Sequence, residues 1–276
     1  MLEIKNLKRL YAANQGLNQV SLKINPSEVV ALLGANGAGK STLFKILLGW
    51  ETPEAGEIVW FGSQTMHSQR KAILDRTGFI ASESWLEQSM TLKDHLNLAG
   101  SSYTYYDQNL VDELLARFKL DLNRKVLTFS RGEKIRAQFV IAFSHHPQLL
   151  LLDEATSGLD AAARQDVLSL LSEHSGNENH GILLATHHSD EVLRLASRVV
   201  FLRKSKILLD LPLNDLLNRV LVCEEKLSSD THTLLGIGMQ NHYYYLLPSD
   251  QEAKNKATLD EILAVLCKEN TGDAHE

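Results

Sequence analysis

Cysteines and long apolar runs are scarce in this chain of 276 residues, and each shortage excludes a class of protein. The two cysteines, Cys223 and Cys267, are too few and too far apart for a disulfide framework or a metal cluster, which favours reduced thiols in a cytosolic protein. No apolar run approaches the roughly 18 residues that span a bilayer. Residues 1–10 alternate charged with apolar side chains, unlike a secretory signal. Any function at a membrane would therefore need another protein that crosses it.

Basic charge is also lacking, because 28 Lys+Arg stand against 34 Asp+Glu and leave a net charge of −6. This balance argues against a protein whose main function is to neutralise nucleic-acid phosphates, and we expect no nucleic-acid partner. The acidic excess lies entirely in residues 213–276, which hold 5 basic and 11 acidic residues. This asymmetry indicates a separate C-terminal segment, and we interpret its acidity as a solvated surface.

Strand and helix patterns alternate along the first 212 residues. Apolar residues at every second position from Val20 to Ile24 predict a half-buried strand, and the unbroken apolar run Val29–Leu33 predicts a buried parallel strand before a helix. Further parallel-strand patterns occupy Leu149–Leu152 and Ile182–Ala185. This order predicts an α/β fold with a mostly parallel sheet and helices on its faces.

Three parts of the chain depart from that alternation. Residues of about 82–146 have the period of helices and predict an α-helical subdomain inserted into a domain that spans residues 1–212. The alternating strands near the N-terminus predict an antiparallel β subdomain. Residues 213–276 combine a short helix, strand-like pieces and a final helix, which predicts a small α+β appendage.

Residues 34–41, Gly-Ala-Asn-Gly-Ala-Gly-Lys-Ser, match the phosphate-binding loop pattern G-x-x-x-x-G-K-[ST] between a strand and a helix. Glycines let backbone N–H groups surround phosphate oxygens, and the helix N-terminus adds positive potential. Lys40 can reach the β- and γ-phosphates, and the Ser41 hydroxyl suits Mg²⁺. A glycine turn beside a surface lysine is the simpler alternative, which this context disfavours. The predicted nucleotide-binding residues are Gly34, Asn36, Gly37, Ala38, Gly39, Lys40, Ser41 and Thr42.

Asp153 and Glu154 follow the apolar run Leu149–Leu152. Such a run predicts a core strand, so Asp153 emerges at its carboxyl end, where open α/β sheets bind ligands. A carboxylate there can hold Mg²⁺ through water, and Glu154 can polarise an attacking water. A solvated strand end is the alternative, but the phosphate loop earlier in the same α/β chain favours a catalytic pair.

Five motifs in a fixed order give the chain a specific resemblance over roughly residues 1–210. They are the phosphate loop, Ser130-Arg-Gly-Glu133, Leu149–Thr156, Ser157-Gly-Leu-Asp160 and Ala185-Thr-His187. In this order the chain resembles the nucleotide-binding subunit of ATP-binding cassette (ABC) transporters, which implies a P-loop NTPase core with ATP and Mg²⁺. The segment Ser-His-His-Pro-Gln at 144–148 is most similar to bacterial exporter ATPases.

The resemblance implies further roles. Tyr11 corresponds to the aromatic residue that stacks on adenine, although it could be an ordinary strand-end tyrosine. Ser130 and Gly132 correspond to the signature sequence that faces the γ-phosphate of ATP held by the opposite subunit. Asp160 matches the carboxylate that crosses the dimer interface.

His187 matches the histidine that contacts the γ-phosphate and keeps the attacking water in line with Glu154, and His188 is the competing assignment. Two positions depart from the family pattern. Arg131 replaces the usual glycine of the signature, which we expect function to survive. The Mg²⁺-sensing position falls on Ser82 by spacing, with Glu83 as a possible substitute one residue later.

Trp85, Leu86 and Met90 lie where the resemblance implies a groove for a membrane subunit, and they form either that docking surface or internal packing. We expect Tyr243–Tyr245 to form core of the appendage. The simplest interpretation of other histidines, such as His67, His95 and His174, is that they lie on the surface.

These observations predict an ATPase on the inner face of the cell membrane, held there by a separate membrane-spanning permease. It would pair with a second cassette as a homodimer or heterodimer and drive transport, with export favoured. The rival is a soluble ABC ATPase that remodels nucleic acid or ribosomes, but such members usually carry two cassettes or a long coiled coil.

Overall fold

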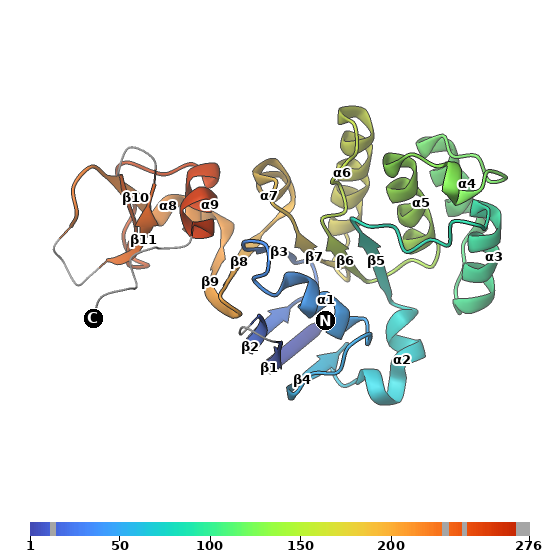
Figure 1. The fold of residues 1–276 in the computed structure, drawn as a ribbon, viewed down its shortest axis with the longest axis horizontal. Helices are drawn as coiled ribbons and strands as arrows, with labels where there is room; N and C mark the ends of the chain where they lie inside the picture. The colour runs from blue at the N-terminus through green and yellow to red at the C-terminus, as the bar shows by residue number, and fades with distance from the viewer. Residues whose placement is uncertain (12–14, 228–231, 239–241, 269–276) are drawn as a thin grey trace.

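A six-stranded sheet forms the middle of the molecule in the computed structural model, which describes residues 1–11, 15–227, 232–238 and 242–268 (Figure 1). The strand order is β5-β6-β7-β3-β8-β9, and every neighbouring pair is parallel except β8 with β9. The mostly parallel sheet expected from the sequence is therefore confirmed. The strands are β3 (Val29–Leu33), β5 (Thr77–Ala81), β6 (Leu149–Asp153), β7 (Gly181–Ala185), β8 (Arg198–Arg203) and β9 (Lys206–Pro212).

Side chains alternate between the two faces of this sheet, so alternate residues of a central strand pack into two different apolar cores. Leu149 and Leu151 pack with helix α1 (Lys40–Leu47) on one face. Leu150 and Leu152 pack with the helices on the other face. Both faces are covered, which explains why the central strands read as unbroken apolar runs. The helices flanking the second face near the middle strands are α6 (Ala161–Ser175) and α7 (Ser189–Leu195).

An antiparallel sheet of order β2-β1-β4 covers the α1 side and confirms the expected N-terminal β subdomain. Its strands are β1 (Leu2–Leu10), β2 (Gly16–Ile24) and β4 (Ala55–Trp60). A helix that the sequence did not predict, α2 (Met66–Leu74), leads from this sheet to β5.

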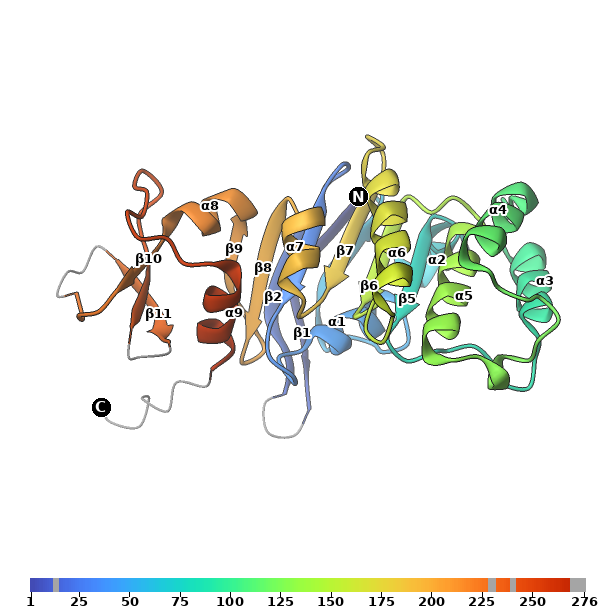
Figure 2. The ribbon, with the colours of Figure 1, turned by 90° about the horizontal axis from the view of Figure 1, so that it is seen from above.

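Three helices lie at one end of the molecule, beyond β5 (Figure 2). They are α3 (Leu92–Ser102), α4 (Gln108–Phe118) and α5 (Arg131–Phe143). A capping box precedes both α3 and α5. The hydroxyl of the N-cap residue, Thr91 or Ser130, accepts the backbone N–H of a residue three positions later, whose carboxylate accepts the backbone N–H of the N-cap residue. The interval 82–146 is not helical throughout, because Val126–Thr128 forms only a 3₁₀ turn.

The C-terminal residues form a second antiparallel sheet of order β10-β12-β11 with two helices. Of the three tyrosines expected in this core, Tyr244 and Tyr245 are buried, whereas Tyr243 is half-buried. Residues of α8 and α9 share one apolar cluster with Ala31 and Leu33 of the large sheet, so this core is continuous with it. The elements are α8 (Leu213–Arg219), β10 (Val220–Cys223), β11 (Thr233–Ile237), β12 (Tyr243–Leu246) and α9 (Leu259–Cys267).

Two histidines expected on the surface are buried, which corrects that expectation. His95 is 7% exposed, and its Nε2 accepts the N–H of Glu87. His174 is 8% exposed because it lies on the same face of α6 as Val167 and Leu171, and its ring stacks on His180. Among the described residues, no helix is both long and apolar enough to cross a bilayer.

Candidate active site

The loop between β3 and α1 leads into a helix whose start is not capped by any side chain. Gly39, with φ 115°, occupies the N-cap position of α1, where no side chain makes a capping hydrogen bond and no acidic residue lies in the first turn. Lys40 is 9% exposed and donates from Nζ to the carbonyl oxygens of Gly34 (2.6 Å) and Ala35 (3.2 Å). The backbone N–H groups at the start of α1 and the Lys40 ammonium can donate to phosphate oxygens. Such oxygens can replace the two carbonyl oxygens as acceptors of the Lys40 hydrogen bonds.

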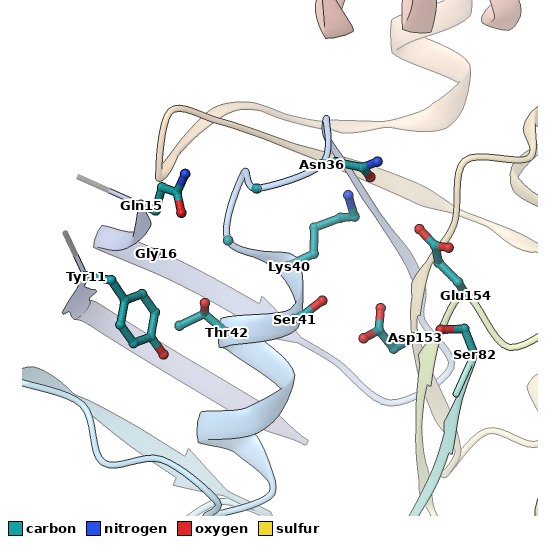
Figure 3. A pocket seen from close by; sticks show the side chains of 12 residues that line it. Tyr11, Gln15, Gly16, Asn36, Lys40, Ser41, Thr42, Ser82, Asp153 and Glu154 are labelled. Atoms are coloured by element: carbon teal, nitrogen blue, oxygen red, sulfur yellow. The ribbon is translucent and has the colours of Figure 1, made fainter. Parts of the chain in front are cut away.

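This loop and the end of β6 enclose a pocket of ≈ 410 Å³ (Figure 3). The pocket brings together residues that are far apart in the sequence, because β3 and β6 both end at this edge of the sheet. Of the predicted loop residues, Gly34 and Ala38 do not line it; Ala38 packs in the core beside α1. The lining residues are Tyr11, Gln15, Gly16, Asn36, Gly37, Gly39, Lys40, Ser41, Thr42, Ser82, Asp153 and Glu154.

Asp153 is the last residue of β6 and faces Ser41 across the pocket (Figure 3). Burial and the neighbouring Glu154 carboxylate raise the pKa of Asp153, while Lys40 and a hydrogen bond with Ser41 oppose that rise. The Asp153 carboxylate and the hydroxyls of Ser41 and Ser82, which line the same pocket, are oxygen ligands of the kind that Mg²⁺ prefers. A divalent cation there would also offset the repulsion between Asp153 and Glu154. The residues present therefore fit the predicted Mg²⁺ site.

Glu154 and His187 lie on neighbouring strand ends. Glu154 has φ 50°, and its N–H donates to the carbonyl of Ala185 in β7 (2.9 Å). This hydrogen bond holds Glu154 next to the end of β7. In the loop after β7, His187 Nδ1 lies 3.6 Å from Glu154 Oε1. The His187 side chain is 60% exposed, and the ring of His188 packs 4.1 Å from it. Of the two histidines, His187 is the one found beside Glu154.

Ser82 lines the pocket, whereas Glu83 does not. Two sets of hydrogen bonds fix the position of Ser82. Its N–H donates to the carbonyl of Asp153 (2.8 Å), and the preceding Ala81 exchanges two hydrogen bonds with the buried amide of Gln138 on α5. Glu83 instead lines a neighbouring pocket together with Arg131 and Lys134.

Tyr11 lies at the end of β1 on the rim of the pocket (Figure 3). Its hydroxyl hydrogen-bonds the Glu51 carboxylate, and this hydrogen bond lowers the pKa of Glu51. Tyr11 is 39% exposed and the guanidinium of Arg9 lies over its ring, 5.3 Å from the ring centre, so part of an aromatic side chain is accessible beside the phosphate loop.

Ser130, Gly132 and Asp160 lie outside this pocket. Ser130 and Asp160 are exposed N-caps of α5 and α6, and Ser130 Oγ accepts the N–H of Glu133 (3.1 Å). Gly132 lies in the first turn of α5. Within one chain, therefore, the signature residues are not brought to the phosphate loop.

An apolar groove of ≈ 350 Å³ lies between the α1–α2 side and the helical insertion. Trp50 (58% exposed) and Trp85 (43% exposed) both line it, and Trp50 packs edge-on against Phe79. Leu86 does not belong to this surface, because it is buried in the core of the insertion at 4% exposed. Met90 is half-buried and does not line the groove either, so of the three expected docking residues only Trp85 does.

A glycine-rich loop at an uncapped helix start, a lysine beside it and a carboxylate pair on the neighbouring strand end define the class of P-loop nucleoside triphosphatases. Comparison with known proteins gives the family. The family model described as ABC transporter matches residues 17–157. The chain belongs to the ABC transporter family, as an ATP-binding subunit.

Three relatives illustrate its range. The ABC transporter ATP-binding protein YtrB of Bacillus subtilis (strain 168) is 27% identical over 265 residues, covering 92% of this chain and 89% of YtrB. The lantibiotic transport ATP-binding protein SrtF of Streptococcus pyogenes is 32% identical, covering 76% of this chain and 90% of SrtF. The sulfate/thiosulfate import ATP-binding protein CysA of Pectobacterium atrosepticum is 31% identical, covering 75% of this chain and 64% of CysA.

Solved structures agree with the predicted fold class. The ATP-binding subunit of an ABC transporter superposes with a TM-score of 0.72 at 31% identity, over 78% of this chain and 91% of that one. A dimeric post-hydrolysis ATP-binding cassette bound to ADP and Pi has a TM-score of 0.68 at 22% identity, over 77% of this chain and 99% of that one. The second likeness shows the fold alone, which is the P-loop NTPase fold expected from the sequence.

Several residues of the site were not predicted. Gln15 and Gly16 line the pocket from the start of β2, and Gln138 fixes the strand that carries Ser82. A glutamine within the apolar run of α5 was the one available signal. Thr156 and Glu191, both buried, connect the loops behind Glu154 and His187.

Proposed function

We propose that this chain hydrolyses ATP and thereby drives a membrane transporter, and that the transport is export. The observation that carries the proposal is a single pocket that holds the phosphate-loop lysine and the pair Asp153 and Glu154. Export is supported by the exporter-like segment at 144–148 and by the relative named for lantibiotic transport. The relative named for sulfate import stands against it.

Hydrolysis would depend on positioning and charge neutralisation. Lys40 would exchange its two carbonyl acceptors for β- and γ-phosphate oxygens, and the N–H groups at the start of α1 would donate to the same phosphates. Glu154 would accept a proton from the attacking water, and His187 beside it would hold that water and the γ-phosphate in line. Mg²⁺, held by Ser41, Asp153 and Ser82, would neutralise phosphate charge.

A second cassette would complete the site. Ser130 and Asp160 are exposed and lie away from the phosphate loop of their own chain, so they are free to face the nucleotide of a partner. ATP held between two chains favours the closed pair, and loss of the γ-phosphate removes that preference. We propose a second copy of this chain as the partner, with a different cassette as the alternative.

A membrane-spanning permease would dock in the apolar groove, which would place the chain on the inner face of the cell membrane. Two exposed tryptophans in one hollow are an unusual surface for an unpartnered protein, and aromatic side chains are common anchors at interfaces. Co-purification decides between this proposal and remodelling of nucleic acid or ribosomes. A detergent-solubilised membrane protein should accompany the chain, whereas ribosomes or DNA would support the rival.

Glu154→Gln tests the hydrolytic proposal, because the amide keeps the shape of the side chain but cannot accept the proton. We expect ATP turnover to fall by roughly 100-fold or more with ATP affinity retained. Glu173→Gln, at an exposed carboxylate on α6, is the matched control and should behave as the unsubstituted chain. Equal turnover by Glu154→Gln and the unsubstituted chain would remove Glu154 from the mechanism.

A further inference from the structure

Glu191, in the first turn of α7, is a carboxylate buried in the middle of a polar cluster. It is 1% exposed, and both of its oxygens are hydrogen-bonded. Oε2 accepts from the Thr186 hydroxyl (2.7 Å), and Oε1 accepts from the Thr156 hydroxyl. Arg164 adds two donors to Oε1, from Nη2 (2.7 Å) and Nε (3.1 Å). One side chain thus satisfies three partners from three separate segments.

Each of these segments carries one of the residues proposed to act on ATP. Thr156 stands two residues after Glu154 in the loop after β6. Thr186 directly precedes His187 in the loop after β7, and its hydroxyl also accepts the N–H of His188 (3.0 Å). Arg164 lies in α6, where its backbone N–H donates to the carbonyl of Asp160 (2.9 Å).

Glu191 itself does not line the nucleotide pocket. It therefore has no route to the reaction except through the residues that it holds. A buried carboxylate is costly unless its partners are fixed, and losing one partner leaves an unpaired buried group. Burial lowers the pKa of Arg164, but its hydrogen bond with Glu191 and the nearby acidic charge raise that pKa overall, so the guanidinium stays charged.

We propose that Glu191 is a positioning residue, which sets the distance between Glu154 and His187 by holding Thr156 and Thr186 on one carboxylate. This inference rests on the proposed hydrolytic function. Loss of the hydrogen bonds to Glu191 should therefore have a selective effect. The nucleotide pocket stays intact, but the groups around the attacking water lose their alignment. Misplacement by about 1 Å can cost on the order of 100-fold in rate.

Matched substitutions in the full-length chain test this. Thr186→Val and Thr156→Val keep the side-chain volume but remove the hydroxyl, whereas Thr186→Ser and Thr156→Ser keep the hydroxyl. We expect the valine variants and Glu191→Gln to lower kcat by roughly 10- to 100-fold while the KM for ATP changes by less than about threefold. The serine variants should recover most of the rate.

Arg198→Met is the control for stability alone. Arg198 is paired with Glu28 and Asp210 at the opposite, amino end of the strands, so its loss should lower the melting temperature and leave kcat unchanged. If the valine variants behave like Arg198→Met, with a lower melting temperature and an unaltered kcat, the positioning role is overturned.

The Glu154→Gln chain distinguishes a failure of the proposed ATP hydrolysis from a failure of the positioning role of Glu191. If it hydrolyses ATP as fast as the unsubstituted chain, the proposed function fails whatever the threonine variants do. If it is inactive and the valine variants retain full kcat, the hydrolytic function stands and the role of Glu191 is refuted.

Discussion

Gly39 is the position in the phosphate loop where the structure leaves least room for a side chain. A Cβ there would lie 2.1 Å from the carbonyl oxygen of Gly16 and 2.9 Å from Cδ2 of Leu17, and φ is 115°. The left-handed backbone costs a non-glycine residue about 1 to 3 kcal/mol. The clash adds overpacking of about 1 to 3 kcal/mol, because the start of β2 must move. Gly39→Ala should therefore destabilise the chain by about 2 to 6 kcal/mol.

Gly62→Ala isolates the clash from the backbone cost. Gly62 also has a positive φ, of 94°, but a Cβ there would meet no atom within 4 Å. Unfolding in denaturant should show Gly39→Ala to be less stable than Gly62→Ala by about 1 to 3 kcal/mol. Only Gly39→Ala should lose ATP affinity, by roughly 10-fold or more, since the moved loop bears the phosphate donors. Equal stability and equal ATP affinity in the two variants would refute this reasoning.

Two further predictions concern acid stability and partner binding. Burial lowers the pKa of His145 to about 4 and of His174 to about 3, below the unfolded value of about 6.5, so the stability present above pH 6.5 is lost as the pH falls toward these values. Each histidine should then lower the free energy of unfolding by up to about 2 kcal/mol at pH 5. Denaturant unfolding at pH 7.5 and pH 5 should show a smaller difference in stability between the two pH values for His174→Phe than for the unsubstituted chain. An undiminished difference would contradict the lowered pKa of His174. Trp85→Ala should reduce recovery of the membrane partner by roughly 10-fold with ATP turnover per chain retained, and unchanged recovery would exclude the groove as the docking surface.

The nucleotide pocket could be predicted in large part because its chemistry is local in the sequence. The phosphate loop spans residues 34–41, and an apolar run places Asp153 at a strand end. Parallel pairing of β3, β7 and β6 then brings both to one edge without further information. The short sequence patterns and the geometry of the parallel sheet therefore predict the same place for the nucleotide pocket.

The support of that pocket could not be predicted, because it depends on polar residues that meet only through tertiary packing. Thr156 lies 35 residues before Glu191, and Gln138 lies 57 residues after Ala81. Residue type alone predicts a surface position for His174, whereas the apolar face of α6 buries it. Trp50 joins Trp85 in the groove from a segment that carried no signal of its own.

The central claim is that ATP joins two of these chains through a shared site. The most direct test is the mass in solution of the Glu154→Gln chain with ATP and Mg²⁺, since this variant retains the γ-phosphate that favours closure. We predict the mass of two chains with ATP and of one chain with ADP. Adding Gly132→Asp, which in the proposed dimer would place a carboxylate beside the partner's γ-phosphate, should restore the mass of one chain. A single-chain mass for Glu154→Gln at saturating ATP would contradict the account.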